Sequence, residues 1–465
     1  MNTIEVLRKF EKDTRSTYNT EVYITGGFVR DLLRKKKNTD LDVVVRFVPL
    51  DDIQKYLSAF GKAKKITLSQ HNGVSETTFV SFRADGDEME AQISSPKGVK
   101  RGSSDIKATL KQDSSQRDFT INAMYIPISR ISTKNVIDYW GGKNDIAGRQ
   151  LLTIGSAKAR FTQSPIRVMR AFALASRLNY NIAGHVKAAI VENAYLLKSV
   201  PQEAIRAEFE EILLSQKPSV CLKMMQKLGV LKVILPELND CAYCVQDKKY
   251  HKYNVFNHLV YTCDYSEPNL ILRLAGLFHD IGKPISKSDG SSEKITFHKH
   301  EVIGARLAAV ILKRLCFDNK TIEEVTHLIR MHMYHYTREY TDAGVRRFIA
   351  NAKMTEKDVE NVGEFPLFKL RIAERLGNGF KKQPITPRQK DFEDRIQKVY
   401  KNSTGLTISD LAIDGNDLIE TFSMKPSRDI GIVLNYLLNL ILEEPFLNER
   451  SALLHCALDF MESKK

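Results

Sequence analysis

The stretch Glu21-Val-Tyr-Ile-Thr-Gly-Gly-Phe-Val-Arg-Asp31, followed shortly by Thr39-Asp-Leu-Asp-Val-Val-Val45, decides the fold of the first part of the chain. Both stretches are rich in β-branched residues, which predicts two short strands. The glycines after the first strand predict a tight turn, and Phe28 to Lys37 has the apolar spacing of a helix. After a helix expected over residues 1–20, this part of the chain therefore has the strand–turn–helix–strand order of an α/β domain.

The turn at Gly26 and Gly27 has the chemistry of a phosphate site. A glycine at a strand-to-helix turn lets the backbone approach a ligand closely, and the free N–H groups at the start of the next helix can hold phosphate. Arg30 lies near enough to add a charged donor. On its own, this pattern fits an ordinary turn between a strand and a helix equally well.

Asp40 and Asp42 form the second chemical feature of this region. Because residues i and i+2 of a strand point to the same face, the two carboxylates lie side by side. They repel each other unless a cation sits between them, and Mg²⁺ binds such carboxylates together with substrate phosphates. A solvated strand edge is the alternative. The glycine turn and the carboxylate pair together indicate triphosphate binding and metal activation of a hydroxyl.

The composition restricts the class of protein. The chain has 465 residues with 70 Lys and Arg against 56 Asp and Glu, a net charge of +14, which points to a polyanionic partner such as nucleic acid or phosphate-rich substrates. The sequence contains no run of about 18 consecutive apolar residues, so it predicts no membrane span. The first 20 residues lack the apolar core of a signal peptide. Six cysteines do not make a disulfide framework. We expect a cytoplasmic protein with no membrane partner.

The spacing of apolar residues changes after Arg160. Segments such as Ile166–Leu178, Glu203–Leu214 and Leu270–Phe278 carry apolar residues at helical spacing. From about residue 155 onward the chain therefore reads as almost entirely helical, with a Gly-, Pro- and Lys-rich linker expected at Asn378–Asp391. The predicted fold class is α+β, with an α/β head that contains a small mixed sheet, followed by a helical remainder.

Several motifs in the right order resemble one family. The chain is similar to class II tRNA CCA-adding enzymes and bacterial poly(A) polymerases over about residues 20–235. The motifs that carry this resemblance, besides the glycine turn and the Asp pair, are Gln116-Arg-Asp-Phe-Thr-Ile-Asn-Ala-Met124, Asp138-Tyr-Trp-Gly-Gly142 with Asp145, Ile166-Arg-Val-Met-Arg-Ala-Phe172, and the helix around Glu203–Glu208.

The resemblance implies a role for each matching residue. Asp40 and Asp42 would be catalytic and hold Mg²⁺, and Glu90 is a possible third acid. The residues implied to bind the nucleotide are Gly26, Gly27 and Arg30 at the triphosphate, Arg117 and Asp118 at the nucleoside, Asp138 in the Asp-x-x-Gly-Gly segment, and Gln163, Ser164, Arg167 and Arg170 at the base.

One short stretch departs from the family pattern. Before the helix that reads the base, the family has Glu-Asp-x-x-Arg, whereas this chain has Gln163-Ser-Pro-Ile-Arg167. An Asp accepts from the amino group of cytosine or adenine, and an Arg donates to the adjacent ring nitrogen, so the pair rejects uracil and guanine. Losing a charged acceptor is worth roughly 1.5–3 kcal/mol, or about 10- to 150-fold in discrimination. The nucleotide preference therefore depends on this stretch, whereas the reaction follows from the other motifs.

A second constellation lies in the helical part. His258, His279-Asp280, His300 and His332 combine imidazole and carboxylate, a common ligand set for transition metals. The run His279-Asp-Ile-Gly-Lys-Pro284 resembles the HD phosphohydrolase superfamily, in which the last ligand is usually Asp. Here the matching residue is Glu374, so an active phosphodiesterase and a structural metal site are both open. Cys241-Ala-Tyr-Cys244 has no second pair and predicts ordinary thiols.

Together these readings predict four parts: a nucleotidyltransferase head over 1–153, a helical neck over 154–235, an HD-type body over 236–380 and a helical tail over 381–465. The implied function is template-independent, Mg²⁺-dependent addition of nucleotides from CTP and ATP to the 3′ end of RNA, with tRNA CCA addition first. A poly(A) polymerase or relaxed tailing enzyme, an HD phosphohydrolase with a nucleotide-binding head, and a non-catalytic RNA-binding protein are the alternatives. We expect no obligate protein partner.

Overall fold

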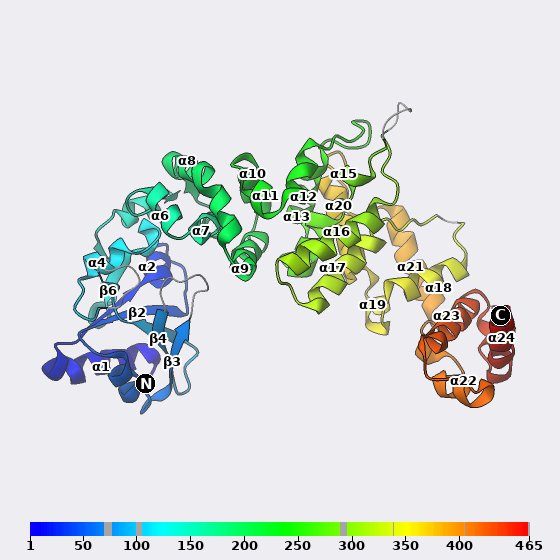
Figure 1. Cartoon of the computed structure of the whole chain (residues 1–465), viewed down its shortest axis with the longest axis horizontal. Coiled ribbons are helices and arrows are strands. Elements are labelled where there is room, and N and C mark those ends of the chain that lie inside the picture. Colours follow the sequence, from blue (N-terminus) through cyan, green and yellow to red (C-terminus); the bar gives the residue numbers. More distant parts are fainter. Residues whose placement is uncertain (69–76, 99–104, 289–294, 338, 404, 464–465) are drawn as a thin grey trace. The chain divides into compact units, whose positions relative to one another are not determined.

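The structure is a computed structural model that describes residues 1–68, 77–98, 105–288, 295–337, 339–403 and 405–463 (Figure 1). The chain divides into two compact units, Met1–Pro236 and Glu237–Lys465. The expected α+β class is confirmed, because a single large sheet lies in the first unit and helices make up nearly all the rest. None of the described helices has the length and apolar character needed to cross a membrane.

A seven-stranded mixed sheet forms the centre of the first unit, in the order β3-β4-β5-β2-β1-β6-β7. β2 is antiparallel to β1 and parallel to β5, so the strand that carries Asp40 and Asp42 lies in the middle of the sheet. The strands are β1 (Glu21–Thr25), β2 (Asp40–Arg46), β3 (Gly61–Leu68), β4 (Thr77–Ala84), β5 (Glu90–Ser94), β6 (Met124–Pro127) and β7 (Ile137–Asp138).

Helix α2 (Gly26–Leu33) begins at the first glycine, directly after β1. The predicted order of a strand followed by a helix is thus confirmed, but no separate turn lies between them: the helix starts two residues before Phe28 and ends at Leu33 instead of Lys37. Val22, Ile24 and Val43 are fully or almost fully buried, and this apolar core fixes the sheet that presents the turn. The other helices of the head are α1 (Thr3–Tyr18), α3 (Leu50–Leu57), α4 (Leu110–Ser115) and α5 (Gly142–Ala147).

The second half of the first unit is helical. α7 contacts α9, and its inner face buries Val168, Met169 and Phe172. A two-stranded parallel sheet joins β8 (Gln150–Leu151) to β9 (Asn181–Ile182) and ties the segment before α6 to the end of α7. The helices are α6 (Ala157–Gln163), α7 (Ile166–Leu178), α8 (Gly184–Asn193), α9 (Gln202–Leu213), α10 (Pro218–Lys227) and α11 (Val230–Ile234), with α12 (Pro236–Asp240) at the division between the units.

The second unit is a helical array in which α13 packs closely on α20. Gly377 makes this approach possible, because a Cβ there would lie only 2.5 Å from Thr262 Oγ1. The array contains α13 (Val255–Tyr265), α14 (Leu270–Phe278), α15 (Lys283–Ser286), α16 (His300–Arg314), α17 (Asn319–Met331), α18 (Asp342–Ala352), α19 (Glu356–Glu360), α20 (Pro366–Gly377) and α21 (Pro387–Lys401).

The segment Asn378–Asp391 is less of a linker than its composition suggests. Asn378 is buried and donates to the backbone carbonyl of Tyr250. Thr386 caps α21, and Pro387 occupies its first position, where proline favours helix initiation. The glycines and prolines of this stretch therefore end one packed helix and begin the next.

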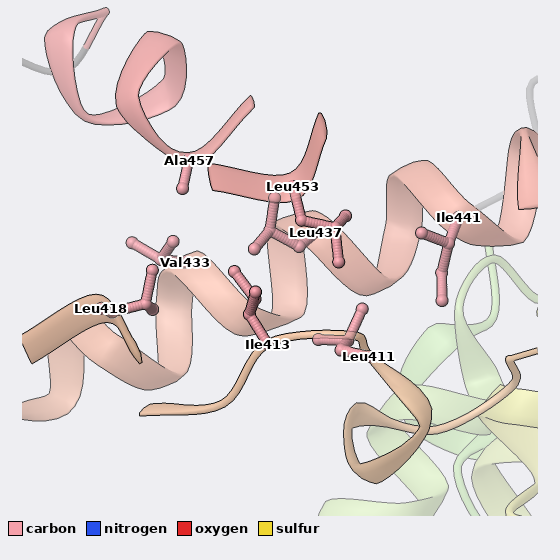
Figure 2. Packing of buried hydrophobic residues seen from close by; sticks show 8 residues of the cluster. All are labelled: Leu411, Ile413, Leu418, Val433, Leu437, Ile441, Leu453 and Ala457. Carbon is pink, nitrogen blue, oxygen red and sulfur yellow. The ribbon is translucent and has the colours of Figure 1, made fainter. Parts of the chain in front are cut away.

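The last part of the chain packs around its own apolar cluster (Figure 2). Three helices, α22 (Gly415–Phe422), α23 (Arg428–Glu443) and α24 (Arg450–Glu462), surround it together with the segment before α22. The buried members of the cluster are Leu411, Ile413, Leu418, Val433, Leu437, Ile441, Leu453 and Ala457.

Candidate active site

A cavity of about 630 Å³ opens in the first unit between the sheet and the helices α7 and α9. Its lining includes residues from five of the predicted motifs, which lie up to 182 positions apart in the sequence. Those residues are Gly26, Gly27, Asp42, Gln116, Arg117, Asp118, Asn122, Arg167, Arg170, Ala207 and Glu208. The fold therefore brings one of the two aspartates and six of the ten expected nucleotide-binding residues, including both glycines, to one cavity.

Gly26 and Asp42 meet at one end of this cavity. Gly26 has a φ of +70°, and a Cβ at this position would collide with the Oδ2 atom of Asp42, so only glycine fits here. Loss of hydration beside the surrounding protein raises the pKa of Asp42, and the negative charge of Asp40 raises this pKa further. The positive charges of Arg117 and Arg30 lower it in part. A cation between the two carboxylates would relieve this repulsion.

The strand next to the aspartates carries the suggested third acid. In the parallel register, Glu90 lies opposite Asp40 and Gln92 opposite Asp42. Ser81 donates a 2.5 Å hydrogen bond to Glu90 Oε1. Gln92 lines the cavity, so an amide and not a carboxylate faces Asp42 from β5. A metal-binding role for Glu90 stays a prediction.

Two residues expected at the nucleotide are engaged inside the protein. Arg30 is buried; it forms an ion pair with Asp31 and donates to Asn122 Oδ1 at 2.9 Å. Asp138 accepts from the backbone N–H groups of Gly142 at 3.0 Å and Lys143 at 2.9 Å, and so caps α5. Neither residue is among those that line the cavity. In the described structure both side chains serve the fold around the site.

Arg117 is held in place by a buried polar group. It pairs with Asp113 at 3.0 Å and donates to the Tyr125 hydroxyl at 3.1 Å. Burial alone would raise the pKa of Asp113, but Arg117 and Tyr125 hold it below its ordinary value. The sequence analysis does not single out Asp113, because the pair forms between α4 and the loop after it, and only the fold brings Arg117 back to Asp113 and Tyr125.

Arg170 connects three parts of the first unit. Its guanidinium pairs with Asp118 at 3.0 Å and with Glu208 at 3.1 Å. These partners belong to the loop after α4 and to α9, while Arg170 itself is on α7. Burial opposes ionisation of Asp118, yet Arg170 and Arg167 keep the pKa of this carboxyl below its ordinary value. The cavity wall is therefore a network of paired charges.

The divergent stretch forms the turn between α6 and α7. Gln163 Oε1 accepts from Arg167 at 2.8 Å and from Arg160 at 3.2 Å, so the amide oxygen faces two guanidinium groups. Arg167 also donates to the backbone carbonyl of Gln116 at 3.0 Å. Arg167 lines the cavity, whereas Gln163 and Ser164 stand outside its lining. Gln163 thus positions Arg167, the arginine for which the resemblance implies a role at the base.

The second unit brings the predicted histidines together with Asp280 and Glu374. The Oδ2 atom of Asp280 lies 3.6 Å from His258 Nε2 and 3.4 Å from His279 Nε2. Its Oδ1 atom lies 3.2 Å from His300 Nε2 and 3.7 Å from His332 Nε2. Asp280 therefore stands between two pairs of imidazoles.

Backbone carbonyls orient these imidazoles. The Nδ1 atoms of His279, His300 and His332 lie 2.9, 2.8 and 2.6 Å from the carbonyl oxygens of Gly276, Phe297 and Ile329. Their Nδ1 atoms therefore donate, and their Nε2 atoms face the cluster as acceptors, which is the arrangement of metal-bound histidines. Among the described residues, the buried Nε2 atoms of His300 and His332 form no hydrogen bond.

The donor set fits a metal. Two groups, His258–His279–Glu374 and Asp280–His300–His332, each hold their ligand atoms within 4.8 Å of one another. Burial lowers the pKa of His258 to about 3, with a further contribution from His279, so this imidazole is neutral. Nitrogen and carboxylate ligands in this combination suit a transition ion. Lys283 reaches Asp280 Oδ2 at 2.6 Å and compensates its charge.

Three family models match the chain. Residues 22–152 match the poly A polymerase head domain, residues 179–241 a probable RNA and SrmB-binding site of polymerase A, and residues 302–457 a putative tRNA nucleotidyltransferase domain 2.

Curated relatives give the same grouping. The CCA-adding enzyme of Geobacillus sp. (strain WCH70) is 31% identical over 49% of this chain and 54% of its own length. The A-adding tRNA nucleotidyltransferase of Deinococcus radiodurans is 29% identical over 52% and 57%. In these matches the chain spans about half the length of the relatives, whereas the CCA-adding enzyme of Lactococcus lactis subsp. cremoris (strain SK11) is 23% identical over 97% and 95%.

Solved structures share the fold. The CCA-adding enzyme of Bacillus stearothermophilus in complex with CTP superposes with a TM-score of 0.65, covering 99% of this chain and 97% of that one at 17% identity. None of these family models, relatives or structures is described as containing an HD domain. The three family models follow each other in chain order, and they agree with the motifs gathered at the first cavity: the chain is similar to CCA-adding enzymes over most of its length and matches the poly A polymerase head domain over residues 22–152.

Proposed function

We propose that this chain is a template-independent nucleotidyltransferase that adds nucleotides from CTP and ATP to the 3′ end of RNA, with tRNA as its substrate. The observation that carries the proposal is the position of Asp42 and Gly26 at one end of a cavity whose wall includes Arg167. Carboxylates, a phosphate-binding turn and a base-reading arginine are thus available to one nucleotide. The six free thiols fit a reducing cytoplasm, where we place the reaction.

Asp40 and Asp42 are the residues that would hold Mg²⁺. The ion, when bound, lowers the pKa of the 3′-hydroxyl and neutralises charge on the triphosphate. The 3′-oxygen attacks the α-phosphorus in line, its proton passes to solvent, and the bond to the β-phosphate oxygen breaks, releasing pyrophosphate. The backbone N–H groups of Gly26 and Gly27 orient the phosphates, and Arg117, fixed by Asp113, donates to the nucleotide.

The choice between CCA addition and tailing is tested by product length. The protein is incubated with Mg²⁺, CTP and ATP, and with either a tRNA that lacks its CCA end or an oligo(A) primer. Three added nucleotides on the tRNA and none on oligo(A) identify CCA addition. A long ladder on oligo(A) identifies a poly(A) polymerase and overturns the tRNA assignment. The variant Asp40→Asn, which keeps the side-chain size, is the inactive control.

We propose a metal-dependent phosphohydrolase centre as a second function of the chain. It is supported by Asp280, which faces two pairs of imidazoles through its two oxygens, so that these residues would hold a metal, which would supply Lewis-acid activation of water. A cavity of about 450 Å³ lies beside Glu374, and its lining includes the cations Arg371, Arg375, Lys381 and Arg388. These cations suit a phosphate ester.

This second function has a separate test. The protein is loaded with Mn²⁺, Ni²⁺ or Co²⁺, its metal content is measured, and hydrolysis of bis(p-nitrophenyl) phosphate is followed. We expect activity that His279→Ala removes together with the metal and that Asp42→Asn leaves unchanged. Bound metal without hydrolysis identifies a structural site, and absence of bound metal contradicts the proposal.

A further inference from the structure

A second cavity, of about 620 Å³, lies in the first unit beside the first cavity, which Asp42 lines. It is formed by the end of α7, the start of α10 and the small sheet β8–β9. Arg177 lines both cavities, so they are neighbours around one side chain. Nothing in the proposed transfer of a single nucleotide uses the second cavity.

The two cavities differ in charge. Among its described lining residues, the second cavity has the cations Arg149, Arg177 and Lys217 and no carboxylate, whereas Asp42, Asp118, Glu208 and Glu211 line the first. Amide side chains, which donate and accept hydrogen bonds, complete the polar lining of the second cavity: Gln150, Asn179, Asn181 and Gln216. Such a surface matches phosphates, 2′-hydroxyls and base edges, the groups by which proteins recognise single-stranded RNA.

Arg149 is exposed and lines the cavity. It has a φ of +51°, in the left-handed region, directly after α5 and its capping residue Gly148. A residue in this conformation commonly ends a helix, although a glycine would adopt it more easily than an arginine does. The end of α5 therefore places a cation at the cavity.

Arg177 is available to an incoming strand. It pairs with Glu211 at 3.2 Å, but both side chains are about half exposed, 51% and 50%. An ion pair so accessible to water contributes little to stability, so a phosphate can take the place of Glu211. Val220, an apolar residue that is 52% exposed, lines the same cavity and offers a surface for a base or ribose.

We propose that the second cavity binds the single-stranded RNA nucleotides that precede the 3′ end, with Arg149, Arg177 and Lys217 contacting their phosphates. The inference rests on the proposed nucleotidyl transfer, since a strand whose 3′ end reaches Asp42 in the first cavity continues past Arg177 into the second. Of the three cations, Lys217 lies within 179–241, the stretch matched by the RNA-binding family model, whereas Arg149 and Arg177 precede it.

The test measures RNA binding without nucleotide, so that it does not depend on catalysis. Two fluorescent hairpin RNAs are compared by anisotropy, one with a four-nucleotide single-stranded 3′ end and one blunt. We expect Arg149→Ala and Lys217→Ala each to weaken binding of the first RNA about two- to five-fold, and the double variant about ten-fold. Each lost contact should reduce the slope of log K against log salt by about 0.7. The blunt hairpin should show neither change.

Three controls keep the result interpretable. Lys232→Ala removes an exposed cation of α11 outside the cavity lining and should bind like the unmodified protein. Arg149→Gly removes the side chain and the backbone strain together, so it should weaken RNA binding without lowering the melting temperature. In addition assays, the KM for RNA should rise in the double variant while kcat and the KM for CTP stay unchanged.

Two results overturn the inference. One is a double variant that binds the overhanging hairpin with unchanged affinity and salt slope. The other is a double variant that no longer binds free AMP but binds RNA as the unmodified protein does, which would identify the cavity as a mononucleotide site. If the unmodified protein adds nucleotides to no RNA but the double variant loses overhang binding selectively, nucleotidyl transfer fails and the RNA subsite stands.

Discussion

The first cavity and the histidine cluster of the second unit differ in how exposed their charged groups are and in how these groups are paired. Around the cavity, Arg170 pairs with Asp118 and Glu208 at an open surface, while Asp40 and Asp42 repel each other. In the cluster, His258, His279, Asp280, His300 and His332 are buried, and the inward nitrogens of His300 and His332 form no hydrogen bond among the described residues. The first arrangement suits a large ligand that brings its own phosphates, and the second suits small ions held without water.

The largest expected effect separates the two sites. Asp42→Asn keeps the volume of the side chain and removes one charge from the pair, which should cost several kcal/mol of transition-state stabilisation. We expect nucleotide addition to fall about 1,000-fold. Metal content of the second unit, measured by mass spectrometry after dialysis, should not change. Loss of both properties would show that the two sites are coupled.

The second effect concerns the cluster. Asp280→Asn leaves Lys283 buried without its ion-pair partner. Removing one member of a buried ion pair lowers the free energy of unfolding by about 3–5 kcal/mol. Metal binding should be lost as well. The single tryptophan, Trp140, lies in the first unit, so unfolding followed by circular dichroism should shift while tryptophan fluorescence does not. Adding Lys283→Met to the variant should recover part of the stability, and a double variant as unstable as the single one would contradict the pair.

The third effect concerns the support of Arg117. Asp113→Asn removes the buried carboxylate that holds this arginine, which should lower the free energy of unfolding of the first unit by about 2–3 kcal/mol. The folded pKa of Asp113 is below its ordinary value, so its stabilisation is present above the unfolded pKa, about 3.9, and is lost as pH falls through the folded pKa.

Trp140 reports this change directly. Its indole N–H donates to Ser114 Oγ at 2.9 Å, beside Asp113. The fluorescence transition should therefore move in Asp113→Asn at pH 7, and the difference from the unmodified protein should shrink in acid below pH 4. A difference that grows in acid would contradict the direction of the pKa shift.

The smallest effect is on the choice of base. Gln163→Glu with Ser164→Asp restores the charged acceptors of the family pattern, and we expect discrimination of CTP over UTP to rise about 10- to 150-fold. Competition assays with both nucleotides measure the ratio. Gln163→Glu with Ser164→Ala is the matched control, because it keeps the charge beside Arg167 and lacks the acceptor for the base. Equal ratios in both variants would show that residue 164 does not face the base.

Local signals were enough to predict much of this molecule. The glycine turn, the aspartate pair and the helices after Arg160 follow from residue type and spacing, which act over a few residues. The gathering of His258, His279, Asp280, His300 and His332 agrees with the HD resemblance, whose motifs extend across those helices.

Contacts between distant segments could not be predicted in the same way. Arg30 and Asp138 sit in motifs that imply nucleotide contact, yet Asn122 and the start of α5 engage them. The orientation of the Gln163 amide depends on Arg160, one turn earlier, and the Asp113–Arg117 pair depends on Tyr125 from β6. Each is decided by which partner the fold brings near a polar group, and a buried polar group must find one.

A structure determined with CTP and Mg²⁺ tests the central claim most directly. We predict a metal ion between Asp40 and Asp42, the triphosphate at the backbone of Gly26 and Gly27, and the base beside Arg167. A triphosphate bound instead at the cations beside Glu374, with no metal at the aspartates, would contradict the account.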